Sequence, residues 1–295
     1  MLAQSKSKRV AKLLISVCYL AGCRVWDVAL LAIGRKPHPQ CMILYYHAIP
    51  PEQRNRFARQ LDMLRSLTTP IGADADPLQV RGCKYSCVTF DDGFQSVLDN
   101  AVPELDKRGI PATLFITAGA LGKCAGWWPE SARYERQDRL LSPEQIASLP
   151  DLVTVGSHTL THPKLPQLCE SEARWELEES RRVLQELLKR KVTSFSFPFG
   201  AFNELLIEWC RQAGYTRVFT SMPLNALSSS TAFVMGRVPV EPTDWWLEFR
   251  LKVLGAYCWL PHAFLIKRWL LSNSIVIKAR HLNRRLTASA ERNRA

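Results

Sequence analysis

The stretch Tyr85-Ser-Cys-Val-Thr-Phe-Asp-Asp-Gly93 decides the fold that the sequence indicates. Its first six residues read as a short buried strand, and Gly93 lets the chain turn sharply afterwards. The two aspartates therefore stand directly behind a predicted strand end. Adjacent carboxylates at such an end point in different directions, so one can bind a metal while the other stays free as a base. Taken alone, Asp-Asp-Gly also fits an ordinary charged turn.

Similar short runs recur on both sides of this stretch. Seven of them read as strands, at 42–46, 85–90, 112–117, 152–155, 192–197, 216–220 and 233–240. Helical patterns lie between most of them, at 56–67, 94–108, 170–191 and 204–213, and Ser142-Pro143 predicts a further helix start. This alternation implies an α/β fold with a parallel sheet, which periodicity leaves either open or closed into a barrel. In both forms ligands bind at the carboxyl ends of the strands.

Two histidines follow the fourth of these runs. His158 and His162, in Gly156-Ser-His-Thr-Leu-Thr-His-Pro163, are four residues apart, so on a helical turn or wound loop both rings face one point. Such a pair is often purely structural. Together with an aspartate from another strand end, however, it makes three ligands with an open position for water, the arrangement of catalytic zinc.

Two further strand ends carry candidate residues. In Phe195-Ser-Phe-Pro-Phe-Gly200, the proline and glycine favour a tight loop that can present a backbone N–H to an oxyanion. A rigid turn without a chemical role is the alternative. His47, in Tyr45-Tyr-His47, is the remaining histidine positioned to reach the site, and a packed strand-end histidine fits the spacing equally well.

In this order, the segments resemble the NodB-type polysaccharide deacetylases, carbohydrate esterases on a distorted (β/α) barrel, over residues 41–245. The resemblance implies about seven parallel strands, Asp91 as general base, and Phe199 as donor of the N–H that holds the oxyanion. It implies Asp92, His158 and His162 as ligands of a divalent metal. We expect zinc, with cobalt, nickel or manganese as alternatives. The implied reaction is attack of water on an acetamide carbonyl, with Asp91 removing the proton.

The sequence departs from the family pattern in three places. Many members carry an arginine where this chain has Ser196, and Arg237 is a candidate for the missing charge. The motif that supplies the general acid has only Leu260-Pro-His262 as a counterpart, so the acid stays unassigned. Asp244-Trp245-Trp246 loosely matches a tryptophan motif, which makes Trp245 either a sugar platform or an anchor to lipid or core. Substrate-binding or accessory roles are thus expected for His47, Pro198, Arg237 and Trp245.

The net charge of +12 lies at the two ends of the chain. Residues 1–40 carry +6 and residues 245–295 carry +8, which leaves −2 between them. A near-neutral middle argues against a nucleic-acid groove. Basic ends mixed with large apolar residues fit an anionic membrane surface, or simply solvated surface. The odd count of nine cysteines, without paired metal-type spacing, favours a reducing compartment.

The N-terminus admits two interpretations. Four basic residues precede the apolar run 13–23, as in a secretory signal, and Leu20-Ala-Gly-Cys23 matches a lipoprotein cleavage box. The helical pattern nevertheless continues to residue 33, and Arg24 and Asp27 interrupt the ~20 apolar residues of a membrane span. We expect an amphipathic helix over 8–33, and a protein in the cytoplasm or peripheral to the inner membrane. A lipoprotein attached through Cys23 is the alternative.

The expected organisation has three parts: a basic amphipathic N-terminal helix (1–40), a catalytic domain (41–245) and a basic, Trp-rich, helical C-terminal extension (246–295). The expected function is metal-dependent removal of N-acetyl groups from amino sugars of a polysaccharide or lipid-linked glycan. The partners are that glycan and a peripheral membrane surface. A weak or inactive glycan-binding protein and a membrane-surface scaffold are the alternatives, but a free base beside a metal site favours an enzyme.

Overall fold

The computed structural model describes residues 6–37, 39–75, 84–226 and 233–266. They fall into two compact units, one ending at Cys258 and one beginning at Trp259. In the second unit, residues 260–266 are helical. All elements named below belong to the first unit.

The strands are β1 (Gln40–Tyr46), β2 (Thr69–Pro70), β3 (Lys84–Phe90), β4 (Ala112–Ile116), β5 (Val153–Ser157), β6 (Ser194–Ser196), β7 (Arg217–Phe219), β8 (Val234–Met235) and β9 (Val238–Pro239). The helices are α1 (Lys6–Ala32), α2 (Arg54–Leu67), α3 (Val102–Asp106), α4 (Arg133–Gln137), α5 (Pro143–Ala147), α6 (Glu170–Leu188), α7 (Glu204–Gln212) and α8 (Trp246–Val253). Single helical turns are η1 (Pro51–Gln53), η3 (Val97–Ala101), η4 (Ala118–Ala120), η5 (Leu165–Gln167) and η6 (Pro198–Gly200).

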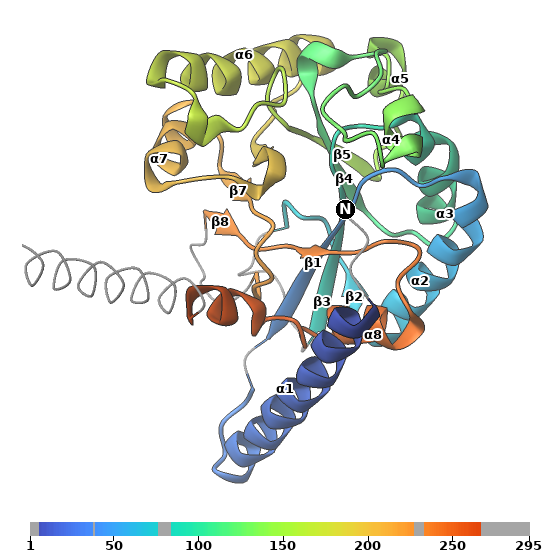
Figure 1. Ribbon diagram of the computed structural model, residues 1–295, viewed down its shortest axis with the longest axis vertical. Coiled ribbons are helices and arrows are strands. Elements are labelled where there is room, and N and C mark those ends of the chain that lie inside the picture. Colours follow the sequence, from blue (N-terminus) through green and yellow to red (C-terminus); the bar gives the residue numbers. More distant parts are fainter. Residues whose placement is uncertain (1–5, 38, 76–83, 227–232, 267–295) are drawn as a thin grey trace, which may run out of the picture. The chain divides into compact units, whose positions relative to one another are not determined.

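One parallel sheet forms the centre of the first unit. Its strand order is β8-β7-β6-β5-β4-β3-β1-β9, with β2 pairing to β3 outside this path. The sheet curls into a half-barrel, and Figure 1 shows helices α2, α3, α5, α6 and α7 around it. The expected distorted (β/α) barrel is therefore confirmed. Since the strands are parallel, their carboxyl ends share one edge, where the candidate residues of the sequence come together.

The last predicted strand, 233–240, is in fact two short strands. Val234 in β8 pairs with Val218 in β7, whereas Val238 in β9 pairs with Leu44 in β1. The chain thus leaves one edge of the sheet and joins the other within two residues, 236 and 237. Because the backbone changes its pairing partner there, a single continuous strand is impossible. This crossing brings the two edges of the sheet together, and we refer to residues 236–237 as the seam.

Local sequence signals account for the helix starts. Ser142 and Gln145 form a reciprocal capping box at α5, and the Asn203 side chain accepts a hydrogen bond from the Leu206 amide, 2.9 Å away, at the start of α7. The helix predicted at 94–108 is not one continuous α-helix, because residues 97–101 form the π-helical turn η3 and α3 begins at Val102. Gly109, with φ of 62°, follows the end of this segment.

The sheet is buried on both faces. In β1 and β3 every residue after the first is buried, and the same holds for all of β4. Each large apolar side chain removed from water contributes about 1.5–3 kcal/mol to folding. The strand ends that carry the candidate residues therefore extend from buried strands of the core.

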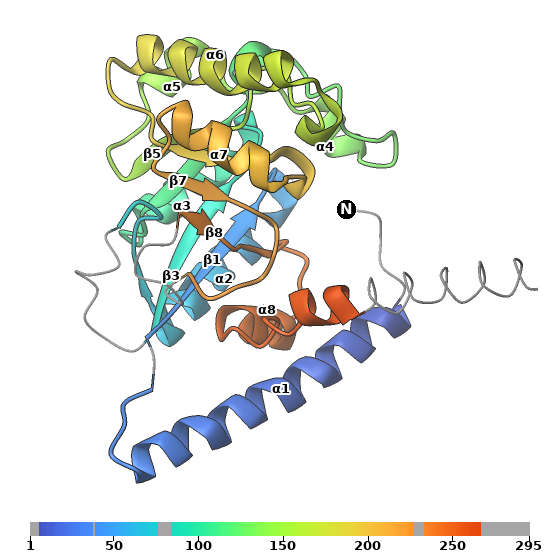
Figure 2. The ribbon, with the colours of Figure 1, turned by 90° about the vertical axis from the view of Figure 1, so that its left-hand side faces the viewer.

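Helices α1 and α8 carry the two expected extensions. Phe249, Leu251 and Val253 of α8 are buried, and α8 packs against α2 and β1, so residues 246–258 belong to the same compact unit as the sheet. The three-part organisation stays a prediction, since compactness alone does not define domains. Helix α1 contacts α8 (Figure 2), but among its described residues only Ser16 is buried. By length and composition α1 could cross a membrane, a property that signal sequences share.

Candidate active site

Asp91 and Asp92 follow β3 in the middle of the sheet. The Asp91 amide donates to the carbonyl oxygen of Tyr46, 3.0 Å away, which ties the end of β3 to the end of β1. Asp92 and Gly93 both have positive φ, 71° and 89°. A left-handed aspartate is uncommon, and such backbone strain concentrates at functional sites. The tight turn gives the two carboxylates different partners, as the sequence predicted.

His158 and His162 follow β5 on a loop rather than a helix. Their Nε2 atoms lie 3.7 and 3.2 Å from Oδ1 of Asp92. Glu176 of α6, which is buried, accepts hydrogen bonds from the amides of Leu160 and Thr161 at 2.8 and 2.9 Å. The loop between the histidines is therefore fixed from behind by a carboxylate that the sequence analysis did not single out.

Asp92, His158 and His162 form a group that could hold a metal ion. All three are buried, and their candidate ligand atoms lie within 4.8 Å of one another. Nδ1 of His158 faces the carbonyl oxygen of Ser196 at 2.8 Å, so this nitrogen carries the proton and Nε2 keeps its lone pair for a metal. Burial lowers the pKa of His158 to about 4, which keeps the ring neutral. The donor set fits a divalent transition metal such as zinc.

Asp91 pairs with Arg237. The guanidinium donates from Nη1 to Oδ1 at 2.7 Å and from Nη2 to Oδ2 at 2.8 Å, a bidentate contact in which both residues are buried. Nη2 also donates to Oγ of Ser196 at 2.7 Å. Burial raises the pKa of Asp91, but the charges of Arg237 and His158 together lower it by more. The pKa of Asp91 therefore lies below its usual range. The candidate base is therefore ionised at neutral pH.

The position of Arg237 follows from the seam between β8 and β9. The aromatic rings of Tyr45, Phe115 and Phe219 surround its guanidinium, with centroids 4.5, 5.2 and 6.0 Å away. The charge expected near Ser196 thus comes from the seam between β8 and β9. Ser196 itself contributes only a hydroxyl, 3.3 Å from Oδ1 of Asp91.

Two tryptophans that the sequence analysis missed hold Asp92 from the other side. Trp127 and Trp128 donate their indole N–H groups to Oδ1 and Oδ2 of Asp92, at 3.2 and 3.0 Å. Trp127 also stacks on the ring of His162, at 4.4 Å between centroids. They lie on the loop between η4 and α4, where no hydrophobic periodicity marks them. The signal in the sequence that could have identified them is the adjacent Trp-Trp pair beside a turn.

A cavity of about 240 Å³ opens over these groups. Its lining residues are Tyr45, His47, Asp91, Asp92, Trp127, Trp128, Pro129, His158, His162, Phe197, Phe199, Gly200, Ser221 and Arg237. This volume is below the roughly 300–1,000 Å³ of pockets that enclose drug-sized ligands, so the cavity takes a small part of a larger substrate.

The remaining candidates divide between the cavity and other places. Phe199 lines the cavity with a left-handed backbone, φ 58°, and its ring contacts that of His162. Pro198 shapes the turn η6 but is not among the lining residues. His47 lines the cavity and packs edge-on against Trp128, whereas His262 is exposed in the second unit. Trp245 lines a different cavity, described below.

Comparison with known proteins gives one consistent result. Residues 79–218 match the family model described as polysaccharide deacetylase. The Bacillus subtilis protein YxkH, itself provisionally named a polysaccharide deacetylase, is 27% identical over 160 residues, 54% of this chain. That match spans about half (52%) of the length of YxkH.

Solved structures share the fold. IcaB from Ammonifex degensii is 26% identical, with a TM-score of 0.62 over 75% of this chain and 98% of its own. The Streptococcus pyogenes deacetylase PplD, solved with acetate, is 19% identical, with a TM-score of 0.61 over 74% of this chain and 99% of its own. With Asp92, His158 and His162 gathered at the ends of β3 and β5, these matches show that the chain is similar to polysaccharide deacetylases in sequence and in fold.

Proposed function

We propose that this protein is a metal-dependent hydrolase that removes N-acetyl groups from amino sugars of a polysaccharide or lipid-linked glycan. One observation carries the proposal: an ionised carboxylate, Asp91, lies beside a separate Asp/His/His ligand set in the same cavity. A protein that only binds glycan has no use for a free base at that position. Similarity to polysaccharide deacetylases supports the same chemistry.

The residues of the site divide the reaction between them. A divalent metal held by Asp92, His158 and His162 would polarise the acetamide carbonyl and acidify a water molecule. Asp91 accepts the proton of the attacking water, and Arg237 holds its carboxylate in place with both oxygens engaged. The Phe199 N–H is the proposed donor to the carbonyl oxygen as negative charge develops there.

Release of the amine requires a proton donor. Among the described residues that line the cavity, His47 is the one histidine outside the proposed ligand set. We assign it to protonate the leaving nitrogen as the carbon–nitrogen bond breaks, which yields acetate and a free amino sugar. Water thus supplies the hydroxyl of acetate, and its proton passes to Asp91.

The proposal is tested by measuring acetate release from N-acetylglucosamine oligomers and from lipid-linked N-acetylated amino sugars, with enzyme loaded with Zn²⁺ or treated with a chelator. We expect activity that disappears on chelation and returns with metal. Asp91→Asn should reduce kcat by about 10²–10⁴, the usual contribution of a general base. If wild type and Asp91→Asn were equally silent on both substrates while glycan still bound, the protein would be a glycan-binding family member.

We also propose that α1 attaches the protein to a membrane surface. Val25, Trp26, Val28 and Leu31 are each more than half exposed in the structure, and basic residues precede them on the same helix. Apolar residues behind a basic start favour the boundary of an anionic bilayer. Co-sedimentation with lipid vesicles tests this attachment.

A further inference from the structure

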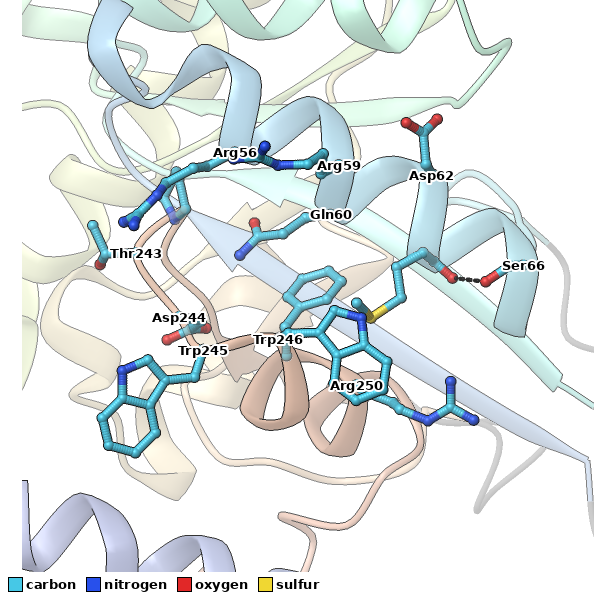
Figure 3. Close-up of a pocket in the computed structure, with 13 residues that line it drawn as sticks. Arg56, Arg59, Gln60, Asp62, Ser66, Thr243, Asp244, Trp245, Trp246 and Arg250 are labelled. Atoms are coloured by element: carbon cyan, nitrogen blue, oxygen red, sulfur yellow. Dashed lines mark hydrogen bonds between the residues drawn. The ribbon is translucent and has the colours of Figure 1, made fainter.

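A second cavity, of about 700 Å³, lies between α2 and the segment 242–250. Arg56 and Arg59 come from α2, and Trp245, Trp246 and Arg250 come from the other wall (Figure 3). We call this cavity the arginine–tryptophan groove. It is wider than the catalytic cavity and belongs to the same compact unit.

The groove presents positive charge that the protein does not neutralise. Its two acidic lining residues are paired elsewhere, Asp62 with Arg108 and Asp244 with Lys252, both at 2.7 Å. Within the part of the chain that the structure describes, Arg56, Arg59 and Arg250 have no carboxylate within ion-pair distance. The groove is therefore complementary to an anion.

Two exposed indoles accompany these arginines. Trp246 is 64% exposed and Trp245 41% exposed, which is high for the largest aromatic side chain. Arg250 lies 5.6 Å from the ring of Trp246, and Arg9 of α1 lies 4.3 Å from the ring of Trp245. Exposed aromatic surface within a groove marks a binding site. The rim at Trp245 is also the place where α1, the helix with an exposed apolar surface, meets the groove.

A third cavity, of about 540 Å³, lies between the groove and the catalytic cavity. This intermediate cavity shares His47, Trp128 and Pro129 with the catalytic cavity. It shares Pro242 and Thr243 with the arginine–tryptophan groove. A chain-like ligand can therefore lie in all three cavities at once.

We propose that the arginine–tryptophan groove is a subsite for a phosphoryl group on the glycan substrate, separated from the reacting acetamide by the sugars that fill the intermediate cavity. The proposal rests on the deacetylase function above and names the class of its substrate. Arginine guanidinium groups match phosphate oxygens in geometry, and several arginines around one groove suit a group with more than one negative charge. The phosphate belongs to a lipid carrier or to a soluble phosphorylated glycan.

The experiment compares binding and turnover of three ligands that contain the same N-acetylglucosamine oligosaccharide. The first is neutral, the second carries a terminal phosphate, and the third carries the same phosphate linked to a polyprenyl chain in detergent. Calorimetry gives Kd for the chelated protein, so binding is measured without turnover. Metal-loaded enzyme gives KM. The variant is Arg56→Gln/Arg59→Gln. Arg65→Gln, an exposed arginine of α2 that does not line the groove, is the matched control.

We expect the terminal phosphate to lower Kd and KM of the wild type by about tenfold, the effect of one charge-assisted contact. The ratio between neutral and phosphorylated ligand should fall towards one in Arg56→Gln/Arg59→Gln and stay unchanged in Arg65→Gln. A larger gain with the polyprenyl ligand assigns the phosphate to a lipid carrier, and an equal gain assigns it to a soluble glycan.

Equal Kd values for neutral and phosphorylated ligand in the wild type would overturn the groove proposal. The proposal would also fail if Arg65→Gln lost the preference for the phosphorylated ligand as fully as Arg56→Gln/Arg59→Gln. It would fail as well if Arg56→Gln/Arg59→Gln bound all three ligands like the wild type and lost only its binding to anionic vesicles, because the arginines would then be a membrane contact. If no ligand is deacetylated but the phosphate still tightens binding through Arg56 and Arg59, the proposed function fails and the subsite stands.

Discussion

Arg237 supplies to Asp91 the charge that its relatives are expected to supply from the position of Ser196. The two side chains touch the same carboxylate, since Ser196 Oγ lies 3.3 Å and Arg237 Nη1 2.7 Å from Oδ1 of Asp91. The guanidinium holds the carboxylate ionised in a buried place where desolvation alone would protonate it. The charge is therefore needed, but its origin in the chain is interchangeable.

This leads to a prediction about the pH dependence of activity. In Arg237→Ser, only the nearby histidines still oppose the effect of burial, so the pKa of Asp91 rises and less of the base is ionised at low pH. The acid limb of the kcat/KM profile should move to higher pH, and kcat at neutral pH should fall by about 10² or more. The double variant Ser196→Arg/Arg237→Ser, which moves the guanidinium to β6, should bring the acid limb back. An unmoved acid limb in Arg237→Ser would show that Arg237 does not set the ionisation of Asp91.

Trp127 and Trp128 give a second prediction at the residue scale, through their hydrogen bonds to Asp92. These bonds fix the orientation of a proposed metal ligand, and removing such a contact usually weakens metal binding by about 10- to 100-fold. Trp127→Phe and Trp128→Phe should each raise the Kd for Zn²⁺, measured by competition with a chromophoric chelator. Trp175→Phe, an exposed tryptophan of α6, is the control and should leave Kd unchanged. Equal Kd values for Zn²⁺ in the wild type and all three variants would show that the two tryptophans contribute only to packing.

Among the elements, the seam between β8 and β9 leaves no room for an added side chain at Gly236. A Cβ at Gly236 would clash with the carbonyl oxygen of Met222 and lie 2.6 Å from Cβ of Leu224. Gly236→Ala should therefore lower the free energy of unfolding by about 1–3 kcal/mol, the usual cost of overpacking, and displace Arg237 from Asp91. Urea denaturation measures the first effect and deacetylation the second.

Gly22→Ala is the matched control for the seam, since a Cβ there meets nothing within 4 Å. This exposed helix position should gain stability, because alanine favours a helix over glycine. If Gly236→Ala were as harmless as Gly22→Ala, the seam would not be tightly packed.

The elements also show what the sequence could and could not predict. The five-residue and longer strands, the caps Ser142 and Asn203, and the gathering of Asp92 with the histidine pair follow from local patterns that the structure confirms. The split of 233–240 does not, because its two halves pair with strands far apart in the chain. The contacts of Arg237 and of Trp127 depend on that long-range pairing and on loop geometry. The hydrophobic periodicity of the sequence predicts neither the long-range strand pairing nor the loop geometry.

At the scale of the first compact unit, three cavities share lining residues in series, and the arginine–tryptophan groove meets α1, a helix whose described residues are mostly exposed. The groove meets α1 where Arg9 contacts Trp245 and pairs with Glu248 at 2.6 Å. Attachment through α1 would therefore hold the groove near a membrane surface, where a lipid-linked phosphate is found. A soluble glycan requires no such attachment.

Vesicle co-sedimentation distinguishes these situations. Trp26 and Leu31 of α1 are 66% and 57% exposed, so changing both to glutamate removes apolar surface from the helix without opening the core. Burying two such side chains in a bilayer contributes about 3 kcal/mol or more, which corresponds to roughly a hundredfold in partitioning. Trp26→Glu/Leu31→Glu should therefore remain in solution where the wild type sediments with anionic vesicles. Leu205→Glu/Trp175→Glu, which changes two equally exposed residues of α7 and α6, should sediment like the wild type. If the α1 variant also sedimented like the wild type, α1 would not be the membrane contact, and a soluble phosphorylated glycan would become the better occupant of the groove.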